Sequence, residues 1–485
     1  MIGLIAALLV ALFAYRMPPL LAIDSALYGA AFGAFPIFWI VFWAIVLYRI
    51  TVETGKFEIL KTSIGHLTSD ASLQALLIAF AFGAFLEGAA GFGTPVAVAA
   101  AILGGLGFSA FNAAGVCLLA NTAPVAFGSI AIPLVTLAAT TGLPIEDLSK
   151  WVGRLCSPVS VFIPAYLVLV MGGVKELKRV WPAALVCGSS FALTQFGVSN
   201  FIGPYLTDIL SSLAAILSLL ALLQFWHPAG MKEIASKYRM SEVIWAWMPY
   251  ILLVVFILAW STESVKALLN SASIVVPWPG LHNAVVQSQP VVEKTTKYAA
   301  LYRFRYLAEA GTSCAFSTMA AALLLRVGLK RYLRILVAAA VQLKWSFVSV
   351  TSVLALAFVM NYSGATGTLG LAFAASGAAF PFFSAMLGWL GVFLTGSDTS
   401  SNALFGNLQQ ITAHRLGLSP TLMASANSAG GVMGKMISLQ SISVAAAAAG
   451  MKAEEEPKLF WFTFKHSLLL AAAVGVLALI YAYAI

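Results

Sequence analysis

Long apolar runs, separated by short polar segments, recur along the whole chain. A helix needs ~20 mostly apolar residues to cross a bilayer, because its backbone amides must be paired within hydrocarbon. The pattern predicts apolar segments at Ala26–Tyr48, Ala71–Phe85, Ala113–Ala139, Val159–Gly172, Trp181–Val198, Ile209–Phe225, Val243–Trp260, Ala299–Leu325, Leu336–Met360, Leu369–Leu394, Leu422–Ala449 and Ser467–Ile485. Several are too long or too interrupted by Gly and Pro to be single spans. We therefore expect an all-α polytopic membrane protein with about 12 to 14 transmembrane segments.

Composition and charge support a multi-pass membrane protein. The chain is 61% hydrophobic and 9% charged, with a mean hydropathy of +0.94, which lies outside the range of soluble globular proteins. Its net charge of +9 does not indicate a nucleic-acid partner, because the basic residues lie in short loops and form no long stripe. The partner that this composition predicts is the lipid bilayer.

Three basic loops predict the orientation of the chain. They read "GGVKELKRV", "HPAGMKEIASKYRM" and "RVGLKRYLR", and each is separated from the next by two apolar runs. All three therefore fall on one side, which the positive-inside rule assigns to the cytoplasm. The segment Arg49–Lys61 joins them, and the polar stretch Ser261–Lys297 then lies outside.

Three pairs of similar blocks, in the same order, predict an internal repeat. They are "GAFLEGAAGFGTP" with "GVFLTGSDTSSNA", "LGFS" with "LGLS", and "ANTAPVAFG" with "ANSAGGVMG". The charge pattern gives the two copies opposite directions, although Pro381 could split the second copy's first run and reverse its sign. We expect one transmembrane domain with two inverted repeats, each with broken or re-entrant helices, at about 20–200 and 300–485, and an outer loop at about 261–298.

The repeat blocks interrupt the apolar runs with Gly, Pro, Asn, Ser and Thr. Irregular backbone at membrane depth is tolerated only where it is buried in protein or lines a cavity. The N-termini of half-helices there present free N–H groups and a positive dipole end to an anion. The predicted substrate-binding residues are Asn121, Thr122, Gly396, Ser397, Thr399, Ser400, Ser401, Asn402, Asn427, Ser428 and Lys435.

The ionisable residues within these blocks are Glu87, Asp398 and Lys435. Desolvation favours the protonated form of a buried carboxyl, so Glu87 and Asp398 are candidate proton carriers. The alternative for Asp398 is a cap on a broken helix. Lys435 could pair with a substrate carboxylate or with Asp398, or extend its side chain from a helix end to the interface. Gly430 and Gly434, spaced G-x-x-x-G, indicate close helix packing or a binding role.

Other classes of function find little support in the sequence. The five histidines form no H-E-x-x-H or Cys/His cluster and no Walker A pattern occurs, so we expect no metal and no cofactor. A membrane enzyme acting on a lipid-linked substrate would need a cluster such as paired aspartates. The aspartates are dispersed along the chain, at Asp24, Asp70, Asp147, Asp208 and Asp398. We therefore expect that the protein is not an enzyme.

Several blocks of this sequence resemble the L-lactate permease family, which also includes glycolate permeases. They are "EGAAGFGTPVA", "LLANTAPVAFG", "NYSG", "GAAFPFFS", "GWLGVFLTGSDTSSNALFGNLQ", "ANSAGGVMGKMIS" and "FTFKHSL". The resemblance runs from about Phe80 to the last segment. One departure is Leu439, where the family usually has proline, so a softer chain break is expected there.

The resemblance implies a secondary active transporter of the inner membrane that imports L-lactate, glycolate or a related 2-hydroxymonocarboxylate with protons. A sodium-coupled carboxylate symporter of similar build stays open, because Asn-Ser/Thr turns offer oxygens that suit sodium. A homo-oligomer also stays open.

Overall fold

The structure, a computed structural model, describes residues 2–65, 67–91, 93–229, 238–292 and 295–484. Lys232 and Lys237 of the second basic loop lie outside these residues. Within the described ranges, eight helices are long and apolar enough to cross a membrane, or up to ten if each of two strongly bent helix pairs is one span. The chain is thus an all-helical polytopic membrane protein, as predicted, but the described residues hold fewer candidate spans than the 12 to 14 expected, because several apolar runs form short or broken helices.

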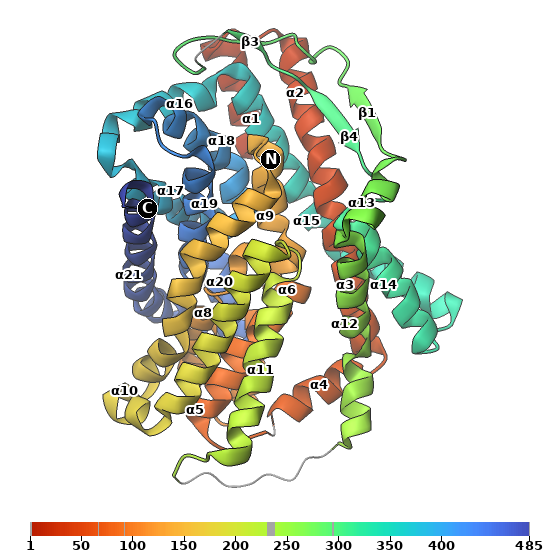
Figure 1. The fold of residues 1–485 in the computed structure, drawn as a ribbon, viewed down its shortest axis with the longest axis vertical. Helices are drawn as coiled ribbons and strands as arrows, with labels where there is room; N and C mark the ends of the chain where they lie inside the picture. The colour runs from red at the N-terminus through yellow and green to blue at the C-terminus, as the bar shows by residue number, and fades with distance from the viewer. Residues whose placement is uncertain (1, 66, 92, 230–237, 293–294, 485) are drawn as a thin grey trace.

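One group of helices lies outside the two broken repeats, largely on the right of Figure 1. There α15 packs against α2, and α14 packs against both α3 and α12. The group comprises α1 (Ile2–Leu9), α2 (Pro19–Phe32), α3 (Trp39–Glu53), α4 (Lys56–Gly65), α12 (Met240–Ser261), α13 (Glu263–Asn270), α14 (Ala310–Leu324) and α15 (Leu329–Ser363).

The two repeat copies fold with the same order of elements: a helix, a break, a second helix, a tight turn, a third helix, a second break and a fourth helix. The first copy consists of α5 (Ala71–Gln74), η3 (Ala75–Phe82), α6 (Gly83–Ala89), α7 (Thr94–Gly105), α8 (Ala110–Ala120), η4 (Val125–Phe127) and α9 (Gly128–Thr141). The second consists of α17 (Phe380–Thr395), α18 (Asp398–Leu416), α19 (Pro420–Gly434), η6 (Lys435–Ile437) and α20 (Leu439–Ala449).

Further helices and short helical turns connect or follow the copies. They are α10 (Ile145–Phe201), α11 (Thr207–Phe225), α16 (Ala365–Phe373), α21 (Glu456–Tyr483), η1 (Val10–Ala14), η2 (Gly33–Phe38), η5 (Ala374–Ala379) and η7 (Ala453–Glu455). The run called α10 is a hairpin whose helical conformation is broken at Gly173. Its two legs lie side by side, as shown by the hydrogen bond that Ser149 donates to the carbonyl of Ser199, 50 residues further on.

The two copies enter the bundle from opposite ends, as an inverted repeat requires. In Figure 1, α5 lies at the lower end of the molecule and α16, which precedes α17, lies at the upper end. Packing between the copies is reciprocal, since α7 contacts α20 and α9 contacts α18. Pro381 stands in the first turn of α17, so the break in the predicted run Leu369–Leu394 falls just before it.

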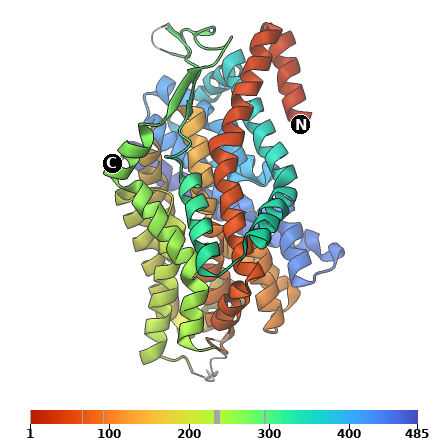
Figure 2. The same cartoon turned by 90° about the vertical axis from the view of Figure 1, so that its right-hand side faces the viewer.

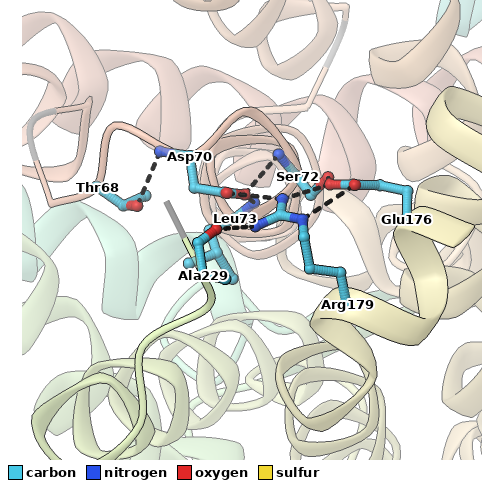
Figure 3. A network of polar contacts seen from close by, with 7 residues as sticks. All are labelled: Thr68, Asp70, Ser72, Leu73, Glu176, Arg179 and Ala229. Atoms are coloured by element: carbon cyan, nitrogen blue, oxygen red, sulfur yellow. Dashed lines mark hydrogen bonds and ion pairs between the residues drawn. The ribbon is translucent and has the colours of Figure 1, made fainter. Parts of the chain in front are cut away.

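A polar network ties the lower end of the molecule together (Figure 3). Asp70 caps α5 by accepting a hydrogen bond from the backbone of Ser72, and Arg179 lies 2.7 Å from Asp70. Arg179 also pairs with Glu176, which accepts a hydrogen bond from the hydroxyl of Ser72 at 2.6 Å. A further bond from Arg179 reaches the carbonyl of Ala229. The first two basic loops therefore meet at one end of the molecule, in agreement with the predicted orientation.

The segment predicted to be an outer loop lies at the opposite end and contains short strands (Figures 1 and 2). β1 (Ile274–Pro277) pairs antiparallel with β4 (Leu301–Phe304), and β2 (Val286–Gln287) pairs with β3 (Thr296–Lys297). The prediction of one apolar membrane segment at Ala299–Leu325 was therefore wrong in its first part. β-Branched and aromatic residues favour this pairing, and α14 begins only at Ala310.

Candidate functional site

The break in the second copy exposes the N-terminus of α18. Gly396 ends α17 in the left-handed conformation, with φ +73°, which glycine adopts without strain. Ser397 is the N-cap of α18, and its side chain accepts a hydrogen bond from the backbone N–H of Ser400 at 3.3 Å. The capping role considered for Asp398 therefore belongs to Ser397, and the carboxyl of Asp398 is free for another role.

A chain of side-chain hydrogen bonds holds one oxygen of Asp398. Its Oδ2 accepts from Ser428 Oγ at 2.7 Å and from Asn402 Nδ2 at 3.2 Å. Asn427 in turn donates to Asn402 at 2.9 Å, and Gln409 donates to Asn427 at 3.0 Å. The other oxygen, Oδ1, is buried and has no hydrogen-bond partner among the described residues. Three of the predicted binding residues thus position an acid.

The break in the first copy surrounds Glu87, which is 5% exposed. A Cβ atom on Gly128 would lie 2.7 Å from its Oε1, so the Glu87 side chain would have to move if residue 128 were larger than glycine. The next three residues, Ser129 to Ala131, all have positive φ, between +47° and +61°. Such backbone is costly for residues other than glycine and clusters at functional sites. Ser129 Oγ donates to the carbonyl of Ala90 at 3.0 Å and so links the two breaks of this copy.

Asn121 and Thr122 belong to the same break, but neither of them lines the cavity described below. Thr122 donates its hydroxyl proton to the carbonyl of Leu119 at 2.7 Å. Asn121 lies close to Glu87, and its own Oδ1 is buried without a hydrogen-bond partner among the described residues.

Lys435 lies at the break between α19 and α20 and reaches back toward the other break of its copy. Its Nζ donates to the carbonyl of Gly396 at 2.8 Å, and it is close enough to act electrostatically on both Glu87 and Asp398. No ion pair joins it to Asp398 in the described part of the chain. The half-buried ammonium thus retains donor capacity for another acceptor.

The break at this lysine persists although Leu439 replaces the usual proline. Ser438 caps α20, Leu439 occupies the first helical position, where proline would also fit, and the two helices meet at 44°.

A cavity of about 310 Å³ lies between the two repeat copies and α15. Its lining residues are Glu87, Val125, Gly128, Ser129, Ile132, Pro133, Trp345, Ser346, Ser349, Val350, Thr395, Gly396, Ser397, Asp398, Thr399, Ser400, Lys435 and Gln440. The structure therefore brings both predicted acids, the lysine and four predicted residues of the α18 N-terminus to one space. The predicted residues that do not line it are Asn121, Thr122, Ser401, Asn402, Asn427 and Ser428.

Five polar lining residues were not predicted from the sequence: Ser129, Ser346, Ser349, Thr395 and Gln440. Ser346 and Ser349 stand one turn apart on α15, and hydroxyls at this spacing in an apolar run are a signal that could have found them. The Nζ of Lys344 lies 5.6 Å from the ring centroid of Trp345, which itself lines the cavity.

Other candidates are explained by packing or lie elsewhere. A Cβ on Gly430 would lie 2.1 Å from the carbonyl oxygen of Ala385, and one on Gly434 would lie 2.4 Å from that of Trp389. This glycine pair therefore allows α19 to touch α17. Glu309 forms an ion pair with Arg305 at 3.0 Å, far along the chain from the breaks. A larger cavity of about 560 Å³ adjoins the first at Gly396, but its lining is mostly apolar.

A helical membrane bundle whose broken repeats enclose a cavity with an ammonium, two acids and several hydroxyls defines a membrane transporter. In the described residues, no group of three or more His, Cys, Asp or Glu could hold a metal ion. The L-lactate permease family model matches residues 1–485, and the chain belongs to this family. It is a transporter and not an enzyme.

Relatives of this chain cover nearly its whole length. Glycolate permease GlcA of Escherichia coli (strain K12) is 44% identical over 509 residues, which cover 99% of this chain and 91% of that protein. L-lactate permease of Bacillus subtilis (strain 168) is 43% identical, over 97% of this chain and 89% of its own. Among solved structures, Neisseria gonorrhoeae MtrF aligns with a TM-score of 0.47 and 14% identity, over 92% of this chain and 81% of that one.

Proposed function

We propose that this chain imports L-lactate, or a related 2-hydroxymonocarboxylate such as glycolate, by proton symport across the inner membrane. The observation that carries the proposal is the lining of the 310 Å³ cavity, where Lys435 faces the same space as Glu87, Asp398 and the α18 N-terminus. The names of the relatives, L-lactate and glycolate permeases, support this substrate class.

The cavity offers complementary groups to each part of such a substrate. The carboxylate accepts hydrogen bonds from Lys435 and from the free N–H groups in the first turn of α18, where the helix dipole also favours an anion. The 2-hydroxyl group meets the hydroxyls of Thr399 and Ser400. The methyl group of lactate lies against the apolar side of the cavity, which Ile132 and Val350 help to form.

The charge balance of the cavity gives a reason for coupling substrate movement to protons. A monocarboxylate and Lys435 neutralise each other, which leaves Glu87 and Asp398 as the acids on the cavity wall. A charge in the bilayer interior costs ~2.5 to 3.5 kcal/mol on insertion scales, so protonation of these acids lets the loaded site cross at lower cost. Coupling follows because one acid releases its proton on the inner side, so that its carboxylate balances the charge of Lys435 while the empty carrier returns.

The test is uptake of labelled L-lactate into proteoliposomes with an imposed pH gradient. The proposal predicts accumulation that collapses when a protonophore is added. Accumulation driven by a sodium gradient at fixed pH, and insensitive to the protonophore, would contradict proton coupling and establish the sodium-coupled alternative. Competition by glycolate against L-lactate then ranks the two substrates.

A further inference from the structure

Asp208 is a buried acid that the cavity does not explain. It lies in the first turn of α11 and is 1% exposed, and it is absent from the cavity lining. Both of its carboxyl oxygens are buried and have no hydrogen-bond partner among the described residues. Other buried acids do have partners, since Asp398 is held by Ser428 and Glu309 by Arg305.

The packing of α11 against α6 places Asp208 beside Glu87. A Cβ on Gly88 would lie 2.8 Å from the Cβ of Asp208, so the two backbones approach this closely only because residue 88 is glycine. Glu87 is the neighbour of Gly88 in the chain. It is also the charged group that acts electrostatically on Asp208. The Oε2 atom of Glu87 is likewise buried without a partner in the described part of the chain.

The surroundings of Asp208 offer no described cation to compensate a second negative charge. α11 packs against α6, η3, α9 and α10. The sequences of η3 and α9 contain no titratable residue, and α6 contributes Glu87. On α10, the thiol of Cys156 lies in the electrostatic field of Asp208, while the cations Lys150 and Arg154 are held by Asp147 and Asn200. Lys435 acts on Glu87 and on Asp398, not on Asp208.

We propose that Asp208 and Glu87 form a buried carboxyl pair that shares a proton, and that Asp208 is therefore a further proton-carrying residue of the transporter. Two neighbouring carboxyls in a medium of low dielectric cannot both ionise without a compensating cation. The two protons then leave in two separate steps, and the apparent pKa of each step describes the pair as a whole and not Glu87 or Asp208 alone. Glu87 faces the cavity and exchanges the shared proton with water, while Asp208, behind it, holds that proton whenever Glu87 is ionised.

This inference rests on the proposed function, because it adds a member to its proton site. It predicts a reciprocal effect: removing either carboxyl removes a negative neighbour, so the remaining acid loses its proton at lower pH. The shift should be about 1 pH unit or more, the range in which coupled sites separate. A merely structural, permanently protonated Asp208 would give no such shift when replaced by the isosteric amide.

The experiment titrates the carboxyl C=O infrared bands of the purified protein without substrate, in the wild type, Asp208→Asn, Glu87→Gln and the double variant. The matched control is Asp147→Asn, which removes an exposed acid paired with Lys150. The expected result is a carboxyl that deprotonates at higher pH in the wild type than in either single variant, with no such signal in the double variant. Asp208→Asn should also move the alkaline limb of L-lactate exchange to lower pH by the same amount.

The pair would be overturned if Asp208→Asn changed neither the titration nor the pH profile of exchange. Should Asp208→Asn fail to fold, the titration of Asp208 in Glu87→Gln decides alone, and an unshifted midpoint there refutes the pair. Because the titration needs no substrate, a wild-type protein that shows the shared proton but takes up no L-lactate would refute the proposed function and not the pair.

Discussion

Lys435 is the single cation among the described residues that line the cavity, and in the proposed function it favours an anion there. Lys435 lies beside a chain break, where the carbonyl of Gly396 accepts one of its hydrogen bonds and two acids lie close enough to oppose its charge. These contacts compensate only part of what an ammonium loses on leaving water. A substrate carboxylate completes the pair, so binding energy is concentrated at this residue.

Replacing Lys435 by glutamine should raise the KM for L-lactate exchange by about 10- to 100-fold. A hydrogen bond to a charged group contributes about 1.5 to 3 kcal/mol, and each 1.4 kcal/mol is a factor of ten. Counterflow of labelled L-lactate measures the KM without a proton gradient. Lys452→Gln, which removes an exposed lysine, is the control. An unchanged KM in folded Lys435→Gln would remove the lysine from the site.

Some of these residues could be predicted from the sequence and others could not, for physical reasons. Glu87, Asp398 and Lys435 stand out because ionisable groups are rare in apolar runs. Asn402, Asn427 and Ser428 were predicted to bind substrate, whereas the structure shows them orienting Asp398, a distinction that depends on side-chain direction. Asp208 looked like one more dispersed acid, because only the packing of α11 on α6 brings it to Glu87.

At the scale of the elements, the repeat blocks predicted the architecture well. Glycine, proline and small polar residues mark where helices must break, and these marks are local in sequence. The turns "LGFS" and "LGLS" fall between the second and third helices of each copy, as the alignment of blocks requires. The β1–β4 pair was not predicted, because it joins residues 24 to 30 positions apart that share no periodic pattern.

Close packing of α19 on α17 should make Gly430 intolerant of a side chain. Gly430→Ala would place a methyl group 2.1 Å from a backbone oxygen, so the helices must separate. Overpacking of this kind costs about 1 to 3 kcal/mol. We expect a Tm several degrees below that of the wild type.

The matched control is Gly104→Ala in α7, where an added Cβ meets nothing within 4 Å. Alanine is favoured over glycine inside a helix by about 1 kcal/mol, so this variant should match or exceed the wild-type Tm. Equal Tm values for the two variants would show that α19 and α17 do not pack as described.

At the scale of the whole molecule, the cavity has walls from parts of the chain that are far apart in sequence. Residues of both repeat copies meet Ser346 and Ser349 of α15, which belongs to the other group of helices. No single segment can therefore bind the substrate, and the sequence could not show that α15 takes part. A ligand in the cavity contacts both groups of helices at once.

Occupancy of the cavity should therefore protect α15 from chemical modification. In detergent solution, Ser349→Cys should react with a maleimide, and L-lactate should slow that reaction. The four native cysteines are buried and give little background. Ser271→Cys, exposed near the outer segment, should react at a rate that L-lactate does not change. Protection of both sites, or of neither, would contradict the assignment of α15 to the substrate cavity.

In the proposed mechanism, the acids on the cavity wall couple substrate movement to protons. The most direct measurement compares two activities of Asp398→Asn in the same proteoliposomes: uphill uptake of L-lactate driven by a pH gradient, and exchange of L-lactate at equilibrium. The account predicts that uphill uptake is abolished while exchange is retained, because the amide replaces the proton carrier without removing the donors that bind substrate. Equal loss of both activities in a folded variant would show that Asp398 supports the structure and does not carry the coupled proton.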